Sequence, residues 1–118
     1  MSLCVAVGGM LVMLAVSTFT LSWTHSVEKT EWTERWAVTQ GGLVVTEARV
    51  EGSGAGMEPP AGAVFDGSGW SYRPPPLPQE RVVLADSGAT GPWTLCTGTE
   101  CRTLGGGDGE RIVLSVCP

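Results

Sequence analysis

Two ionisable side chains interrupt the apolar positions of an alternating stretch, and they are the first candidates for chemistry. Between residues 19 and 28 apolar and polar residues alternate, and His25 falls on the apolar parity. The next segment repeats the alternation, and Glu34 is its single interruption. When an imidazole is protonated, it can bind the carboxylate of a substrate. Beside a second ionisable group, it can also respond to a change in pH. The same two groups can also satisfy each other as a structural pair in the core.

Catalysis by these residues is not expected, because the nearest nucleophile points the wrong way. Ser26 directly follows His25, so on a strand its hydroxyl lies on the face opposite the imidazole. A metal site built from His25, Glu34 and Met57 would rest on three residues that need not converge. We therefore predict that the protein is not an enzyme and has no catalytic residue, no metal and no cofactor.

The strands that carry the two ionisable residues can be aligned with each other. Alternation with a period of two is typical of a strand with one buried face. A four-residue loop over residues 28–31 places His25 opposite Glu34 and Trp23 opposite Trp36, so that each apolar residue meets another. Directly opposed side chains lie about 5 Å apart at Cβ. This register predicts a cross-strand pair within a candidate ligand-binding group of His25, Glu34, Trp23, Trp36 and Met57.

A second hairpin follows directly. Residues 40–42, Gln-Gly-Gly, suit a three-residue hairpin loop whose glycine takes the left-handed conformation. That loop sets Trp36 opposite Thr46 on one face and Arg35 opposite Glu47, an opposite-charge pair, on the other. The two hairpins together predict a three-strand antiparallel meander.

Composition favours an all-β fold and excludes one class of partner. The 118 residues include 17 Gly and 8 Pro, with turn signals at short intervals. We expect a single small antiparallel β-sandwich or partly open barrel that starts with the meander. The net charge is −5, and there is no basic patch of the kind that binds nucleic acid.

The N-terminal segment is apolar enough to be an export signal. Residues 3–16 carry no charge, and their length suits the hydrophobic region of a signal peptide better than a bilayer span. We expect a leader helix over residues 1–17, cleaved after Ser17, and an all-β domain over residues 18–118. The alternative is an uncleaved anchor through residues 3–16. In both cases the protein is exported, periplasmic or otherwise extracytoplasmic, and meets the membrane only through an uncleaved N-terminus.

The cysteines support an oxidising compartment. Cys96 and Cys101 are close enough in sequence to close a small ring across a turn, and a disulfide explains the spacing better than a zinc site does. Cys117 is left over after removal of the leader. It can be free, pair with another chain, or replace one partner in the ring.

Several local signals, taken in order, resemble a known family. They are WTHSVEKTEWTERW (residues 23–36), TEARVEGSGAGM (residues 46–57), Gly69-Trp70, Leu84-Ala85-Asp86-Ser87, and Leu95-Cys96 followed by Cys101 and Leu104. Their order and spacing resemble the small bacterial and archaeal domain of unknown function that is encoded beside TAXI-type TRAP uptake transporters. The resemblance implies an exported protein that accompanies a solute-binding protein and a membrane permease, and it implies no established activity.

Two functions are therefore expected from the sequence. The first is a non-catalytic accessory domain that docks on the TAXI-type solute-binding protein or on a TRAP permease subunit. The second is a module that binds a small organic anion near His25 and Glu34. A flat apolar surface patch would favour docking, whereas an apolar groove with a few polar groups would favour a ligand.

Overall fold

The protein is all β in the computed structural model, which describes residues 1–24, 30–52, 61–85, 92–105 and 111–118. No helix occurs within these ranges. The strands are β1 (Leu3–Val7), β2 (Met10–Leu14), β3 (Thr18–Thr24), β4 (Glu31–Thr39), β5 (Gly42–Glu51), β6 (Val64–Phe65), β7 (Gly69–Tyr72), β8 (Arg81–Leu84), β9 (Trp93–Thr97), β10 (Glu100–Leu104) and β11 (Ile112–Val116). The all-β prediction is confirmed.

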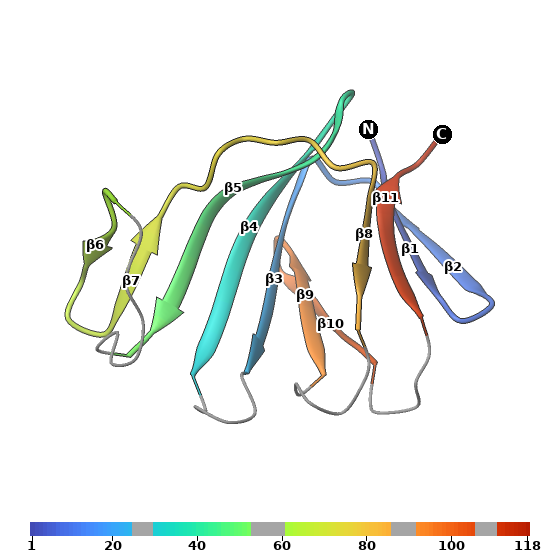
Figure 1. Ribbon diagram of the computed structural model, residues 1–118. Coiled ribbons are helices and arrows are strands. Elements are labelled where there is room, and N and C mark those ends of the chain that lie inside the picture. The colour runs from blue at the N-terminus through green and yellow to red at the C-terminus, as the bar shows by residue number, and fades with distance from the viewer. Residues whose placement is uncertain (25–29, 53–60, 86–91, 106–110) are drawn as a thin grey trace.

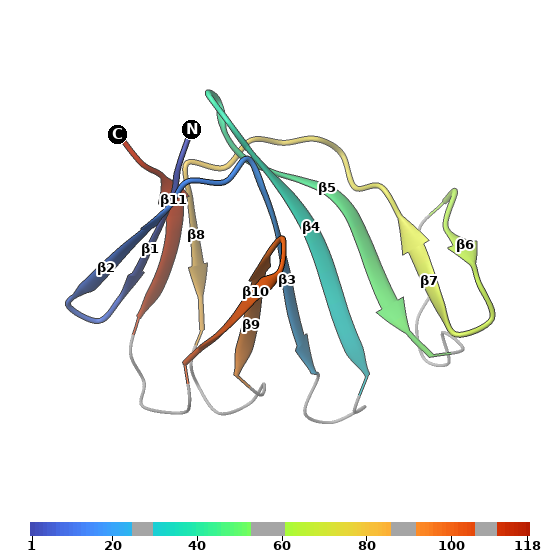
Figure 2. The same ribbon diagram turned by 180° about the vertical axis from the view of Figure 1, so that it is seen from behind.

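The strands form two antiparallel sheets. The seven-stranded sheet has the order β10-β9-β3-β4-β5-β7-β6, and the four-stranded sheet has the order β2-β1-β11-β8. In Figure 1 and Figure 2 the four-stranded sheet lies toward β9 and β10, at the end of the molecule away from β6 and β7. The four-stranded sheet covers one part of the seven-stranded sheet. Strand β5 contacts β8 and β11, and Trp36, Val38 and Leu43 of β4 and β5 belong to the shared core.

A single hydrophobic core lies between the two sheets. Leu3, Ile112 and Leu114 enter it from the four-stranded sheet, and Leu21 and Leu95 enter it from the seven-stranded sheet. All five have 1% of their surface exposed or less. Burial of this kind is the main favourable term in folding, so residues from both ends of the chain help to stabilise the fold.

The N-terminal apolar segment is part of the fold, so the prediction of a leader helix is wrong. Strands β1 and β2 form a hairpin through Gly8 and Gly9, and β1 pairs along its whole length with β11. A disulfide joins Cys4 to Cys117, which answers the open question about Cys117. Cleavage after Ser17 would remove two of the four strands of this sheet. In the part of the chain that the structure describes, no helix has the length and apolarity needed to cross a membrane.

The pairing of β3 with β4 differs from the predicted register. Trp23 lies opposite Trp32, and Glu34 lies opposite Leu21. The predicted opposition of Trp23 and Trp36 is therefore wrong, as is the cross-strand position assigned to Glu34. The predicted partner His25 lies outside the described residues. Strand β3 ends at Thr24 and β4 begins at Glu31, so the connection is longer than the four residues assumed.

The pairing of residues between β4 and β5 agrees with the prediction at the end away from the turn and differs from it near the turn. Arg35 lies opposite Glu47 as expected, but Trp36 lies opposite Val45 because a β-bulge follows Arg35. The hydroxyl of Thr46, the extra residue, donates a hydrogen bond of 3.1 Å to the Arg35 carbonyl. Such bulges re-aim the strand and increase its twist.

The turn end of β5 is held against the segment that leads into β8. Leu43 and Gln79 exchange two backbone hydrogen bonds of 2.8 and 2.9 Å. A Cβ on Gly42 would lie 2.6 Å from the Gln79 carbonyl oxygen, and Gly42 has a φ of +133°. Glycine is therefore required at position 42, both for its backbone angle and for this close approach.

Candidate functional site

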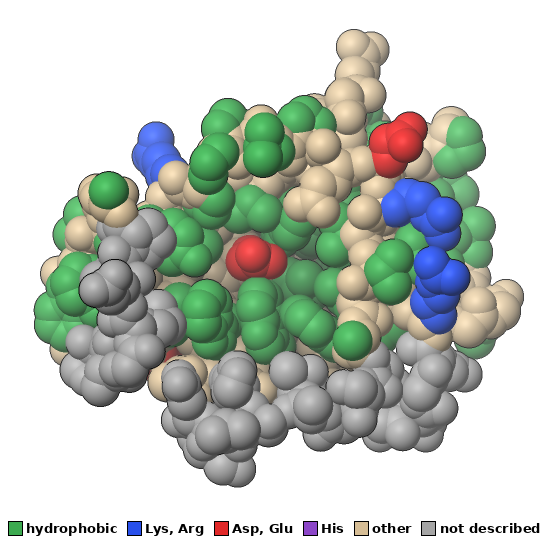
Figure 3. All heavy atoms as spheres, viewed as in Figure 1, with side chains coloured by type: hydrophobic (Ala, Val, Ile, Leu, Met, Phe, Trp, Pro, Cys, Tyr) green, Lys and Arg blue, Asp and Glu red, His purple; other side chains and the backbone are tan. Residues whose placement is uncertain are grey.

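Glu34 is a carboxylate on the inner face of the seven-stranded sheet, among apolar side chains. Its cross-strand neighbours are Leu21 on β3 and Ala48 on β5. Trp32 and Trp36 lie two positions away on β4 and therefore share its face. Figure 3 shows an acidic side chain recessed among hydrophobic side chains over this part of the sheet, the setting that the register and burial assign to Glu34.

The surroundings of Glu34 favour its neutral form. Burial raises the pKa of Glu34 above its ordinary value of 4.5, and a hydrogen bond from the Trp36 indole opposes this shift. Trp36 Nε1 donates that bond to Glu34 Oε1 over 3.3 Å. Tyr72 lies beyond Ala48 on the same face, and its pKa is raised by burial and by the negative charge of Glu34. The carboxylate therefore influences a second polar group across the sheet.

A row of aromatic side chains crosses the same face next to Glu34. Trp23 stacks on Trp32 with ring centroids 6.2 Å apart and contacts Trp93 at 4.8 Å. Across Val50 the row continues with Trp70, which contacts Phe65 at 5.1 Å. We call Trp23, Trp32, Trp70, Trp93 and Phe65 the aromatic row. It places large apolar side chains beside a single carboxylate.

Two indole groups of the aromatic row lack a hydrogen-bond acceptor among the residues that the structure describes. They are the buried Nε1 atoms of Trp32 and Trp70. An unsatisfied buried donor costs about 1–3 kcal/mol. This cost marks the row as a place where packing of the aromatic rings has been favoured over complete hydrogen bonding.

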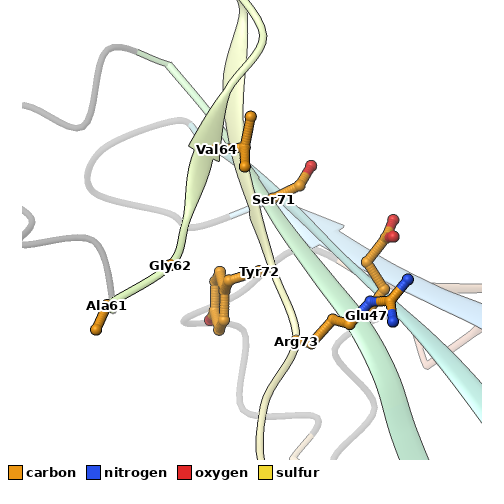
Figure 4. Close-up of a pocket in the computed structure, with 7 residues that line it drawn as sticks. All are labelled: Glu47, Ala61, Gly62, Val64, Ser71, Tyr72 and Arg73. Atoms are coloured by element: carbon orange, nitrogen blue, oxygen red, sulfur yellow. The ribbon is translucent and has the colours of Figure 1, made fainter.

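A cavity lies at the edge of the seven-stranded sheet. It has a volume of about 370 Å³, and Glu47, Ser71, Tyr72 and Arg73 contribute polar groups to its lining. Figure 4 shows the Tyr72 ring turned toward Gly62, away from Glu47 and Arg73. The cavity carries both signs of charge, because the carboxylate of Glu47 and the guanidinium of Arg73 both line it.

The turn beside this cavity is organised by Asp66. The Asp66 carboxylate accepts backbone hydrogen bonds from Ser68 and Gly69 and pairs with Arg49 at 3.2 Å. Those hydrogen bonds, chiefly the two from the backbone, hold the pKa of Asp66 well below its ordinary value. Asp66 thus has a structural role at the start of β7.

The four-stranded sheet presents an apolar outer face. Leu11, Ala6, Val113 and Val83 lie opposite one another in a single row across its four strands. Leu11 and Val83 have 63% and 52% of their surface exposed, and Met13 on the same face has 63% exposed. We call these five residues the outer apolar face. Such exposed patches are typical of surfaces that meet a partner.

Three of the five predicted site residues lie on one face. Trp23, Glu34 and Trp36 share the inner face of the seven-stranded sheet, whereas His25 and Met57 lie outside the described residues. Sequence reasoning missed Trp70 and Tyr72, which β7 brings beside β5. The signal available for them was the alternation in residues 69–72, Gly-Trp-Ser-Tyr.

The predicted disulfide is confirmed, and a second one is present. Cys96 and Cys101 are bonded to each other across the β9–β10 hairpin, and Cys4 is bonded to Cys117. Two disulfides in a small domain are consistent with an extracytoplasmic location. Within the described ranges, no three His, Cys, Asp or Glu side chains gather in an arrangement that could hold a metal ion.

Comparison with known proteins gives one result. Neither the curated proteins nor the solved structures yield a match. A family model, described as a domain of unknown function (DUF1850), matches residues 19–104. The match spans strands from β3 to β10, including almost all of the seven-stranded sheet with Glu34 and the aromatic row, while β1, β2 and β11 lie outside it. Because the match covers most of the chain, this protein belongs to the DUF1850 family of domains of unknown function.

Proposed function

We propose that this domain is a non-catalytic module that binds a small organic ligand on the inner face of the seven-stranded sheet. The observation that carries the proposal is the half-buried carboxylate of Glu34 beside the aromatic row. Ligand sites combine apolar and aromatic walls with a few precisely placed polar groups. An acid whose pKa is raised by burial is also a common mark of a functional position.

The inner face suits this role better than the cavity at the sheet edge. Glu34 is held by β4 at the centre of a sheet, with the rigid neighbours β3 and β5 on either side. Sites on rigid elements hold their groups more precisely than sites on short edge strands. The edge cavity is partly lined by Ala61 and Gly62, which precede the two-residue strand β6.

The biological setting is proposed from the family resemblance. We propose that the protein is exported to the periplasm or an equivalent compartment and works with a TAXI-type TRAP uptake system. The two disulfides support an extracytoplasmic location. Under this proposal the ligand is a small solute that the uptake system handles.

A second candidate function is docking on a subunit of that uptake system. The outer apolar face supports it, because Leu11, Met13 and Val83 are exposed there on a face that Ala6 and Val113 also share. Burying an apolar sheet face of this kind against a partner is favourable, because water is excluded from the apolar surface. The proposed occupant is an apolar surface of the TAXI-type solute-binding protein or of the TRAP permease.

Ligand binding is tested by thermal unfolding of the full chain with a panel of small organic acids, amines and neutral isosteres. A ligand that binds the folded state raises Tm in a saturable manner. The shift should be lost in Glu34→Ala and kept in Glu31→Ala, an exposed position on the same strand. If no compound of any charge raises Tm, the binding proposal is wrong.

Docking is tested separately by co-purification with the transporter subunits. Leu11→Lys and Val83→Lys place charges on the outer apolar face and should abolish retention of the partner. Val64→Lys is the matched control, because Val64 is also an exposed apolar residue, 65% accessible, but lies on β6. Equal retention by all three variants would exclude the outer apolar face as the contact.

A further inference from the structure

We propose that the ligand of the inner face is a small organic cation, with an alkylammonium group bound between Glu34 and Trp32. This inference rests on the proposed function, since it names the class of ligand for the same site. It departs from the small organic anion expected from the sequence. The expectation of an anion depended on protonated His25, whereas the charge that the described residues place on this face is a carboxylate.

The local distribution of charge favours a cation. Arg35 follows Glu34 on β4, and Arg49 follows Ala48 on β5, so both guanidinium groups belong to the opposite face. Arg49 is also paired with Asp66 at 3.2 Å. Among the described residues, these arginines are therefore not placed to neutralise Glu34. A carboxylate in a partly desolvated apolar setting gains most from a cation brought to it by a ligand.

The aromatic neighbours supply the second part of such a site. Trp36 donates its indole N–H to Glu34, so the edge of its ring meets the carboxylate, while the ring itself is buried in the core and stacked on Phe19. Trp32 lies on the same face of β4 and stacks on Trp23. Aromatic rings within about 6 Å attract alkylammonium groups, and cages of such rings are used to recognise quaternary ammonium ligands.

An organic cation fits these groups better than a bare metal ion. Ca²⁺ and Mg²⁺ require several oxygen ligands around one point. No group of three potential acidic, His or Cys ligands is present among the described residues. One carboxylate with a partly exposed indole ring beside it instead matches a soft, weakly hydrated cation, whose alkyl groups gain from apolar contact while its charge meets the acid.

The test is a titration of the full chain followed by intrinsic tryptophan fluorescence and calorimetry. The probes are methylammonium, tetramethylammonium and choline, with 3,3-dimethylbutanol as the neutral isostere of choline and succinate as an anion, all at equal ionic strength. We expect at least one ammonium compound to saturate the protein below about 10 mM, where binding is worth only a few kcal/mol. The neutral isostere should bind at least about tenfold more weakly, because it lacks the charge.

Substitutions show where the cation binds, and the choice of probes separates failure of this inference from failure of the proposed function. Glu34→Gln should weaken binding of the cation by about tenfold or more, while Glu31→Gln, exposed on the same strand, should leave it unchanged. Far-ultraviolet circular dichroism of each variant verifies that it is folded. Saturable binding of succinate without any ammonium compound would overturn the inference and keep the proposed function. Failure of every probe to bind would overturn the inference, and failure of the wider panel of organic compounds would overturn the proposed function.

Discussion

Trp36 donates its indole N–H to the carboxylate of Glu34 across 3.3 Å, although the two residues belong to the same strand and are only two positions apart. Side chains at such positions share a face of the sheet. The bond therefore gives a charged group a partner within a surface that is otherwise apolar. It offsets only part of the effect of burial, because burial is the larger influence on the pKa of Glu34.

The first prediction concerns the pH dependence of stability. Burial raises the pKa of Glu34 in the folded state. The contribution of Glu34 to the free energy of unfolding is therefore largest below its ordinary pKa of 4.5, and this contribution is lost as pH rises through the folded pKa. Glu34→Gln should therefore increase the free energy of unfolding at pH 7, by less than about 1 kcal/mol after solvent screening. Urea unfolding at pH 7 and pH 4 measures this. If Glu34→Gln increased the free energy of unfolding equally at both pH values, stability would not depend on the protonation of Glu34 and the prediction would be wrong.

The second prediction tests the register of β3 against β4. Trp23 and Trp32 stack directly, so their alanine variants should show a coupling energy of about 0.5–1.5 kcal/mol in a double-mutant cycle. Trp23 and Trp36 form the control pair and should give additive losses, since they are not opposed in the ladder. Coupling of Trp23 to Trp36 in place of Trp32 would restore the register that the sequence suggested.

The third prediction compares the two disulfides. The Cys4–Cys117 bond spans 113 residues, and the Cys96–Cys101 bond spans five. Loop-closure entropy assigns about 4.7 kcal/mol to a loop of about one hundred residues and roughly 2 kcal/mol to the small one. Replacing Cys4 and Cys117 with alanine should therefore lower Tm more than replacing Cys96 and Cys101. The reverse order in calorimetry would show that the chain ends are tied together by other contacts.

The fourth prediction concerns the N-terminal hairpin. A protein that begins at residue 18 lacks β1 and β2, and it exposes Ile112 and Leu114, which are fully buried in the complete chain. We expect this truncated protein to lose its cooperative thermal transition. A protein that lacks only residue 1 is the control. If the truncated form unfolded cooperatively at the same Tm, the hairpin would be dispensable, as a cleaved leader would be.

The fifth prediction concerns Asp66. Because hydrogen bonds lower its pKa in the folded state, Asp66 contributes stability above its ordinary value of 3.8, and this contribution is lost as pH falls toward the folded pKa. Asp66→Asn should lower Tm at pH 7, with a smaller difference at pH 3. Glu80→Gln, at an exposed position, is the control. If Asp66→Asn lowered Tm more at pH 3 than at pH 7, the stabilising role of the ionised Asp66 carboxylate would be excluded.

Alternation predicts which residues face inward, but it does not fix the β3–β4 register. Trp23 was expected opposite Trp36 and lies opposite Trp32, four positions earlier. A shift by an even number leaves every side chain on its original face, whereas a shift by one would reverse them all. The inward set of Trp23, Glu34 and Trp36 was therefore predicted correctly, and the pairing within it was not.

Two other features lacked a decisive sequence signal. The bulge after Arg35 adds one residue, Thr46, to β5, and nothing in the local alternation announces it. The N-terminal segment is uniformly apolar, so its periodicity does not distinguish a leader helix from a pair of strands. Gly8-Gly9, at its centre, was the available signal, because adjacent glycines suit a two-residue hairpin turn.

The bond between Cys4 and Cys117 has a consequence for the way the fold can be rearranged. The backbone N–H of Cys117 also donates to the Ser2 carbonyl over 2.9 Å, and Figure 1 shows the N- and C-terminal ends side by side. The path of the chain is therefore almost a closed ring. A circular permutant that joins these ends with a short linker and opens at the Gly98 turn would keep every strand pairing. We therefore expect the architecture to tolerate this change in the order of its strands along the chain.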